Sequence, residues 1–280
     1  MSDKKSAIIW MLTSAFCFAC MGAMVKLAVD IPIFEKVFFR NLVGFLIAGW
    51  LVVKNRENPF KQGRNTKFLL LRSLAGFVGV IAYFYAISNL PLSDSTMLNK
   101  LSPFFVMIFA GIFLKEGFTK KKLIFVLLAF SGALLIIKPT LDLSILPAVS
   151  GVASAIFAGI AYTTVRYLKG KASSNMIVFY FSTISVIGSI PLLIPVYVTP
   201  SSYSLMLLIG TGVFAGIGQI TLTKAYHKAP ASEISIFNYA SVVFATIIGI
   251  FIGDGYPDML SIGGGVLIFL VAFWNFKGKK

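Results

Sequence analysis

The chain has 280 residues, of which 58% are hydrophobic and only 12% charged, and its 25 Lys and Arg residues against 10 Asp and Glu give a formal net charge of +15. So small a charged fraction cannot cover the surface of a soluble domain of this length, which excludes that class. The basic residues are divided among separate loops and do not form one face, so we expect no nucleic-acid partner.

Apolar segments long enough to cross a lipid bilayer recur along the whole chain. They lack the strict alternation of a transmembrane barrel, which favours helices. We therefore expect an all-α integral membrane protein with the bilayer as its partner. Its ten transmembrane helices are predicted at residues 7–27, 33–53, 68–89, 93–114, 121–138, 145–168, 175–195, 204–226, 232–253 and 260–276.

The basic residues predict how these helices are oriented. If the N-terminus is cytoplasmic and the chain crosses ten times, the Lys and Arg residues fall on or near the inner side with the exception of Lys26, Lys36, Arg40, Lys100 and Lys138. This bias follows the positive-inside rule. We expect a multi-pass protein of the bacterial inner membrane, with both termini in the cytoplasm.

The chain also repeats its own pattern at a spacing of about half its length. At an offset of 139 residues the matching positions are Pro91 and Pro230, Ser93 and Ser232, Asp94 and Glu233, Asn99 and Asn238, and Ser102 and Ser241. We interpret this as a duplication, with one five-helix repeat at residues 1–140 and another at residues 141–280. Because five is odd, the two repeats would cross the membrane in opposite directions, which places substrate sites near the bilayer midplane.

Short motifs occur in a fixed order along both halves. They are Arg40-Asn41-Leu42, Leu71-Arg72-Ser73-Leu74, Tyr83-Phe84-Tyr85-Ala86, Pro91-Leu92-Ser93-Asp94, Ser102-Pro103, Ala225-Tyr226, Ala229-Pro230-Ala231-Ser232 and Asn238-Tyr239. In this order and spacing the sequence resembles the ten-helix EamA-type family of the drug/metabolite transporter (DMT) superfamily, over nearly the whole chain. The resemblance implies a transporter and no enzyme. Two positions depart from the family pattern: Asp254, where Glu is usual, and Lys100, where a small or neutral residue is expected.

Two asparagines are the first candidates for a substrate cavity. Asn99 and Asn238 each lie roughly 6 Å from the centre of a predicted helix, at about 1.5 Å per residue. An amide in lipid is costly, so both should face the protein interior, on either side of a central cavity. The alternative is that each holds two helices together by a hydrogen bond.

Two cations are candidates for contact with an anionic substrate group. Lys100 lies about 9 Å below the outer boundary, and a cation at such a depth usually faces a wet cavity or a partner. Its alternative is to extend outward to the interface. Arg40 occupies a family position at which a structural role is an equal alternative.

Further candidates come from the other polar groups inside the predicted helices. Gln219, Tyr83, Tyr162 and Tyr239 carry groups that need hydrogen-bond partners when buried, and are expected to line the cavity. Pro103, predicted in the middle of a helix, would remove a backbone hydrogen bond and provide a hinge. No predicted helix has a carboxylate at its midplane, which weakens a proton-coupled multidrug exporter and favours exchange or facilitated diffusion.

These patterns together predict a carrier of small metabolites that works by alternating access. We expect the cargo to be an amino acid or another carboxylate-bearing molecule. An S-adenosylmethionine or nucleoside-type uptake carrier and a broad exporter of amphipathic compounds are the alternatives. No catalytic residue, metal site or cofactor is expected. The apolar helices at 121–138 and 260–276 are candidates for a homodimer interface.

Overall fold

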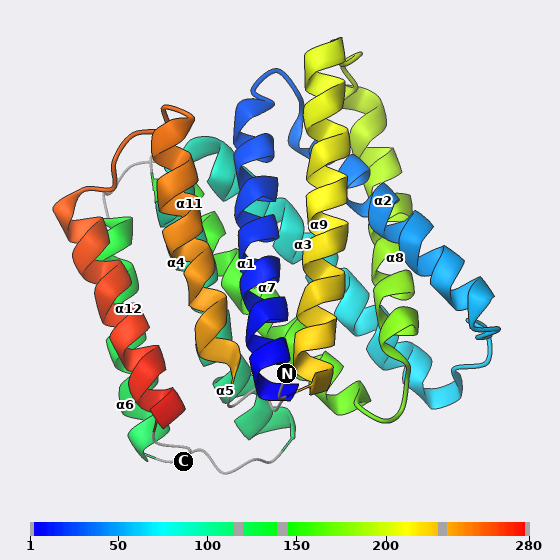
Figure 1. Ribbon diagram of the computed structural model, residues 1–280, viewed down its shortest axis with the longest axis horizontal. Helices are drawn as coiled ribbons and strands as arrows, with labels where there is room; N and C mark the ends of the chain where they lie inside the picture. The colour runs from blue at the N-terminus through cyan, green and yellow to red at the C-terminus, as the bar shows by residue number, and fades with distance from the viewer. Residues whose placement is uncertain (1–2, 115–119, 139–144, 229–233, 278–280) are drawn as a thin grey trace.

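The computed structural model describes residues 3–114, 120–138, 145–228 and 234–277, and within these ranges it contains helices and no strand (Figure 1). The first half contains α1 (Asp3–Leu27), α2 (Ile33–Lys54), η1 (Gly63–Asn65), α3 (Thr66–Asn89), α4 (Leu92–Asn99), α5 (Ser102–Phe113) and α6 (Lys120–Ile137). The second half contains α7 (Leu146–Leu168), α8 (Ser174–Leu193), η3 (Ile194–Val196), α9 (Ser202–Lys228), η4 (Ser235–Tyr239), α11 (Ala240–Phe251) and α12 (Met259–Lys277).

Each of the ten predicted spans corresponds to a helix or to two consecutive helices. Within the described ranges, seven segments are long and apolar enough to cross a membrane, and three shorter apolar helices accompany them at Leu123–Ile137, Ile236–Phe251 and Met259–Asn275. The all-helical fold class is thus confirmed. The start of the second copy of the duplicated motif, from Pro230 to Glu233, lies outside the described residues.

The fourth predicted span is broken into α4 and α5. The backbone N–H groups of Lys100 and Leu101 donate to carbonyl oxygens three residues earlier, at 3.0 and 3.1 Å, and this tighter bonding ends α4. Pro103 lies in the first turn of α5. A proline at that position loses no helical hydrogen bond, because the first N–H groups of a helix have no partner within it. Its predicted mid-helix position is therefore wrong, since the break comes before it.

The main helix pairs each join an element of the first half to one of the second. α1 packs on α9, α2 on α8, α3 on α7 and α6 on α12 (Figure 1). Glycines allow some of these pairs to approach closely. A Cβ atom added to Gly132 of α6 would lie 2.8 Å from the carbonyl oxygen of Gly264 in α12.

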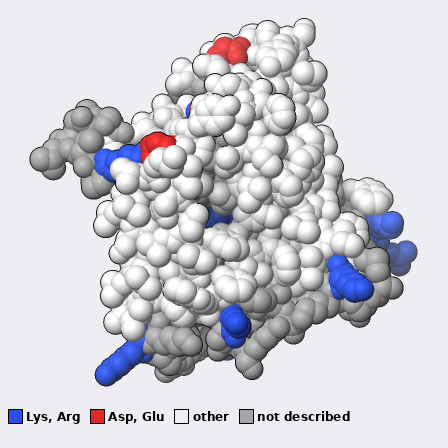
Figure 2. Space-filling view, turned by 60° about the vertical axis from the view of Figure 1, so that its left-hand side comes forward, with Lys and Arg blue, Asp and Glu red and all other residues white. Residues whose placement is uncertain are grey.

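Charged residues gather at the two ends of the bundle, with an apolar band between them. The chain termini lie at one end, which we call the basic end (Figure 1). Figure 2, with the same vertical axis, shows most of the visible Lys and Arg toward that end, with smaller blue areas in the middle and next to an acidic residue toward the opposite end. Exposed cations of the basic end include Lys54, Arg56, Lys61, Arg64, Lys67, Lys169, Lys171 and Lys277. The opposite end, the far end, carries Asp30, Asp254 and Asp258 in the loops after α1 and α11.

Candidate functional site

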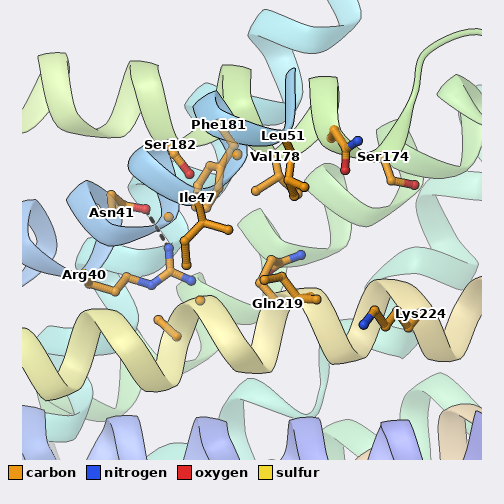
Figure 3. Close-up of a pocket in the computed structure, with 16 residues that line it drawn as sticks. Arg40, Asn41, Ile47, Leu51, Ser174, Val178, Phe181, Ser182, Gln219 and Lys224 are labelled. Atoms are coloured by element: carbon orange, nitrogen blue, oxygen red, sulfur yellow. Dashed lines mark hydrogen bonds between the residues drawn. The ribbon is translucent and has the colours of Figure 1, made fainter. Parts of the chain in front are cut away.

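A cavity of about 270 Å³ lies between α2, α8 and α9, beside the middle of the bundle (Figure 3). The surface of its lining is mostly apolar, with several polar side chains contributed by α2, α8 and α9, as is usual for a small-molecule site. The residues that line it are Arg40, Asn41, Gly44, Ile47, Ala48, Leu51, Ser174, Asn175, Val178, Phe181, Ser182, Ala215, Gly216, Gln219, Ile220 and Lys224. Small residues on α2 and α9, such as Gly44 and Gly216, leave the space that larger side chains would fill.

The cavity extends from the interior toward the basic end. Arg40 lies near the middle of α2, whereas Ser174 is the first residue of α8 and Lys224 is close to the end of α9. Gln219 and Lys224 extend from α9 toward the cavity (Figure 3). Near this mouth Glu57 accepts hydrogen bonds from Ser173 and from the lining residue Asn175.

Arg40 forms the deep cationic part of the cavity. One terminal nitrogen, Nη1, donates to Asn41 Oδ1 at 2.7 Å (Figure 3), and Asn41 in turn donates to the Val37 carbonyl oxygen at 2.8 Å. The guanidinium carbon lies 5.3 Å from the ring centre of Phe181 on α8. The Nε atom of Arg40 is buried and has no hydrogen-bond partner among the described residues. The guanidinium group of Arg40 can donate hydrogen bonds to an anionic group of a ligand in the cavity.

A second arginine meets the same aromatic ring. The guanidinium carbon of Arg72 on α3 lies 4.0 Å from the Phe181 ring centre, and the side chain is only 4% exposed. Its Nε and Nη1 atoms lack a hydrogen-bond partner within the described part of the chain. Tyr162 of α7 lies near both arginines. The sequence alone predicts that Arg72 belongs to the basic residues near the inner side. The positions of Arg72 and Phe181, 109 residues apart, do not indicate that the two side chains are in contact.

A separate polar cluster surrounds the break between α4 and α5. Lys100 Nζ donates to Asn238 Oδ1 at 3.2 Å, and the Tyr239 hydroxyl donates to the Lys100 carbonyl oxygen at 3.0 Å. Asn99 donates from Nδ2 to Ser154 Oγ on α7 at 2.9 Å. None of these candidate residues is among those that line the cavity between α2, α8 and α9. Each asparagine thus forms a hydrogen bond to a residue outside its own helix, which is the arrangement that its alternative, structural role requires.

Tyr83 and Tyr162 lie between these two regions. The Tyr83 hydroxyl shares a hydrogen bond of 3.2 Å with Thr96 Oγ1 of α4, and Tyr162 lies near Tyr83. Tyr162 is 45% exposed although it belongs to a helix packed against α3. Of the predicted cavity residues, Arg40 and Gln219 line this cavity, and Tyr162 lies near Arg40 and Arg72. The structure places Asn99, Lys100, Asn238 and Tyr239 elsewhere.

A set of charge-assisted contacts joins three segments at the far end of the bundle. Lys26 of α1 forms an ion pair with Asp254 at 2.8 Å and donates to the Leu90 carbonyl oxygen at 2.6 Å. The other oxygen of Asp254 accepts from the Leu92 backbone N–H at 2.5 Å. These contacts join the end of α1, the turn between α3 and α4, and the loop after α11.

Known proteins match this chain over nearly its whole length. A model of the EamA-like transporter family matches residues 5–138 and again residues 146–276. The pseudopaline exporter CntI of Pseudomonas aeruginosa is 34% identical over 279 residues, 99% of this chain and 98% of that protein. An S-adenosylmethionine uptake transporter of Rickettsia prowazekii is 25% identical, covering 98% of this chain and 94% of its own length. One solved crystal structure has the same fold, with a TM-score of 0.68 at 15% identity and 99% of both chains covered.

Proposed function

Because the chain belongs to the EamA-like transporter family, we propose that this multi-pass membrane protein carries a small metabolite across the bacterial inner membrane by alternating access. The observation that supports this mechanism is the cavity between α2, α8 and α9. It contains a cation without an acidic partner in the described ranges, extends to the basic end, and belongs to a bundle in which Lys26 and Asp254 join segments at the far end. A carrier in a state open to one side has these features.

The positive-inside rule assigns the basic end to the cytoplasm, so both termini are cytoplasmic and the cavity is in an inward-facing state. In alternating access, the far end would open while the mouth near Lys224 closes. Two halves that rock against each other would produce this exchange.

The two-fold relation between the halves has three independent supports. The family model matches the chain twice, at residues 5–138 and 146–276. The helix contacts also have the symmetry that a duplication requires. α1 and α7 are the first helices of the two halves, and α3 and α9 are the third helices. α1 packs on α9, and the equivalent pair, α7 on α3, is also present. Finally, the break at Lys100 corresponds, at the offset of 139, to the junction of η4 and α11 at Tyr239. We propose inverted five-helix repeats at residues 1–140 and 141–280.

The cargo that this cavity fits best is a carboxylate-bearing metabolite, because Arg40 presents a buried guanidinium group to it. The alternative of S-adenosylmethionine uptake takes its support from the relative with that name. The pseudopaline exporter shows that a protein 34% identical exports a metabolite. An apolar lining with Phe181 leaves the broad export of amphipathic compounds as the remaining alternative.

A cavity-filling substitution tests the proposal. Gly216 lines the cavity, and a Cβ atom there would already meet Ile47 Cδ1 at 3.1 Å, so Gly216→Phe should fill the space and stop transport. Liposomes containing the purified protein would be loaded with a bacterial small-molecule extract, and the released solutes measured by mass spectrometry. We expect a set of solutes to leave wild-type vesicles at least tenfold faster than Gly216→Phe vesicles, a difference of about 1.4 kcal/mol.

The matched control is Gly263→Phe in α12, where nothing lies within 4 Å of an added Cβ atom. This variant should release the same solutes as the wild type. If wild-type and Gly216→Phe vesicles release all solutes alike, the cavity is not a transport pathway and the proposal is wrong.

A further inference from the structure

Two arginines converge on one phenylalanine deep in the bundle, without an acidic residue to pair with either. Arg40 and Arg72 lie 5.3 and 4.0 Å from the ring centre of Phe181, and they come from different helices, α2 and α3. In the described ranges no carboxylate forms an ion pair with either guanidinium group. Glu35, on the same helix as Arg40, accepts instead from the Val198 backbone N–H at 3.4 Å.

This arrangement is unfavourable in the empty protein. Arginine remains protonated in proteins, so both groups are positive wherever they are buried. An unpaired buried charge is costly, and two like charges near each other repel. Contact with the face of an aromatic ring compensates only part of that cost. A ligand that brings negative charge into the cavity would supply compensation that the described residues do not.

The backbone around the ring is shaped to hold the arginines there. A Cβ atom added to Gly76 of α3 would lie 2.8 Å from Phe181 Cε2 and 3.1 Å from Arg72 Nη1. A glycine at this position therefore lets the ring and the guanidinium group come against α3. Asn41 accepts a hydrogen bond from one terminal nitrogen of Arg40, and the buried Nε atom has no partner among the described residues. Both arginines are thus positioned by their surroundings, although only Arg40 lines the cavity.

We infer that the transported substrate is a net anion with at least two carboxylate groups, one of which binds Arg40 while the charge of Arg72 behind Phe181 selects for the second. This inference rests on the proposed transport function and narrows its substrate class. A zwitterionic amino acid would bring one ammonium group for each carboxylate, and the cavity lining contains Arg40 and Lys224 but no acid. Glu57, at the mouth, is engaged by Ser173 and Asn175. Lys224 places a further positive charge along the path.

Arg72 acts through the ring and not by direct contact, so it is a positioning residue for charge. Its effect should depend on charge alone and not on the shape of the guanidinium group. Arg72→Lys should therefore retain the preference for dianions, and Arg72→Gln should lose it. Arg40→Gln should lose binding of all carboxylates, because it removes the direct contact.

The experiment uses liposomes that contain the purified full-length protein. They are loaded with the bacterial extract together with equal amounts of succinate, succinamate, lysine and glycerol 3-phosphate. Succinate and succinamate differ only by one carboxylate replaced by an amide. We count as transported the solutes whose release Gly216→Phe blocks. We expect most of them to have at least two more carboxylate groups than ammonium groups. Arg72→Gln should slow their release about tenfold or more, as expected for loss of an interaction with a charged group.

The matched control is Arg64→Gln, which removes the same charge from an exposed position of η1 at the basic end. It should leave the release rates and the solute pattern unchanged.

Three results would overturn the inference while leaving the carrier intact. Neutral or cationic solutes could dominate the set that Gly216→Phe blocks, or Arg72→Gln could leave the release of dianions unchanged. Release of glycerol 3-phosphate without any polycarboxylate would identify a phosphate site instead. Equal release by wild-type and Gly216→Phe vesicles is a different result, because it contradicts the transport function itself.

Discussion

The Lys100 ammonium group, only 9% exposed, has the Asn238 amide oxygen as its described side-chain partner, at 3.2 Å. We expect Asn238→Ala to lower the free energy of unfolding by about 1–3 kcal/mol, because it leaves a buried charged donor unsatisfied. Lys100→Met combined with Asn238→Ala should recover most of this loss, since replacing both partners by apolar groups is nearly neutral. Thermal unfolding in detergent measures both.

The interpretation fails if the double variant is no more stable than Asn238→Ala alone. Ser204→Ala provides a comparison, because the Ser204 hydroxyl also bonds a charged group, the Asp30 carboxylate, at 2.8 Å but near the far end. It should not be rescued by Lys100→Met.

At the level of residues, the sequence indicates which polar and charged side chains lie inside helices, but it does not indicate which residues they contact. Lys100 and Arg40 were both recognised as cations inside helices, and Arg40 does lie on the cavity. Lys100 does not, because Asn238, 138 positions later, lies within hydrogen-bonding distance. For Arg72 the sequence predicts a depth near the inner side, because helical spacing gives the depth of a residue but not its neighbours in other helices. Its contact with Phe181 is a tertiary one that no local pattern encodes.

The pair of α6 and α12 depends on the absence of side chains at two glycines. A Cβ atom at Gly132 would lie 2.8 Å from the Gly264 carbonyl oxygen and 2.9 Å from Ile268 Cγ1. We expect Gly132→Val to separate the two helices and to cost about 1–3 kcal/mol of stability, the usual range for overpacking. The free energy of unfolding in detergent would be compared with that of Gly263→Val, which has nothing within 4 Å.

Gly132→Val and Gly263→Val add the same atoms to the same helix pair. A similar loss of stability in both variants would therefore indicate an effect of helix propensity and not of packing. The glycines of this pair are in contact within one chain. A homodimer, which remains a prediction, would therefore have to use another face of α6 and α12.

At the level of elements, hydrophobic length predicted the spans well because each crossing needs about 20 apolar residues whatever its neighbours are. The break at Lys100 was not predicted. The segment from Leu92 to Phe113 has the length and hydropathy of one span, and the sequence pattern places its helix breaker at Pro103. The chain leaves the helix earlier, where Tyr239 bonds the Lys100 carbonyl oxygen from the other half.

For the whole molecule, the ion pair of Lys26 and Asp254 is expected to control which side is open. Asp254→Asn should weaken this closure, because the ion pair and the charge on the acceptor for the Leu92 N–H are both lost. The population should then shift toward states open at the far end. A single cysteine at Val178 on the cavity, in a Cys17→Ala, Cys20→Ala background, should react about threefold or more slowly with a reagent added at the basic end.

Asp258→Asn is the matched control, because its pair with Lys138 lies in the same region but is more exposed, at 54% and 36% against 8% and 21% for Asp254 and Lys26. An exposed pair contributes only about 0–1 kcal/mol, so labelling should change little. Unchanged labelling in Asp254→Asn would show that this contact does not hold the far end closed.

The pairing of first-half with second-half helices has a consequence for biosynthesis. α1 is complete at residue 27, but its partner α9 ends at residue 228, and α2 likewise waits for α8. At roughly 5–20 residues per second, about 10–40 s separate the two events. During that interval Arg40, Arg72 and Lys100 lie in a nascent chain without the second-half residues Phe181 and Asn238 that they contact in the finished protein. The buried cations of the first half are therefore inserted before their contacts in the second half exist, and the bundle can be completed only when translation is nearly finished.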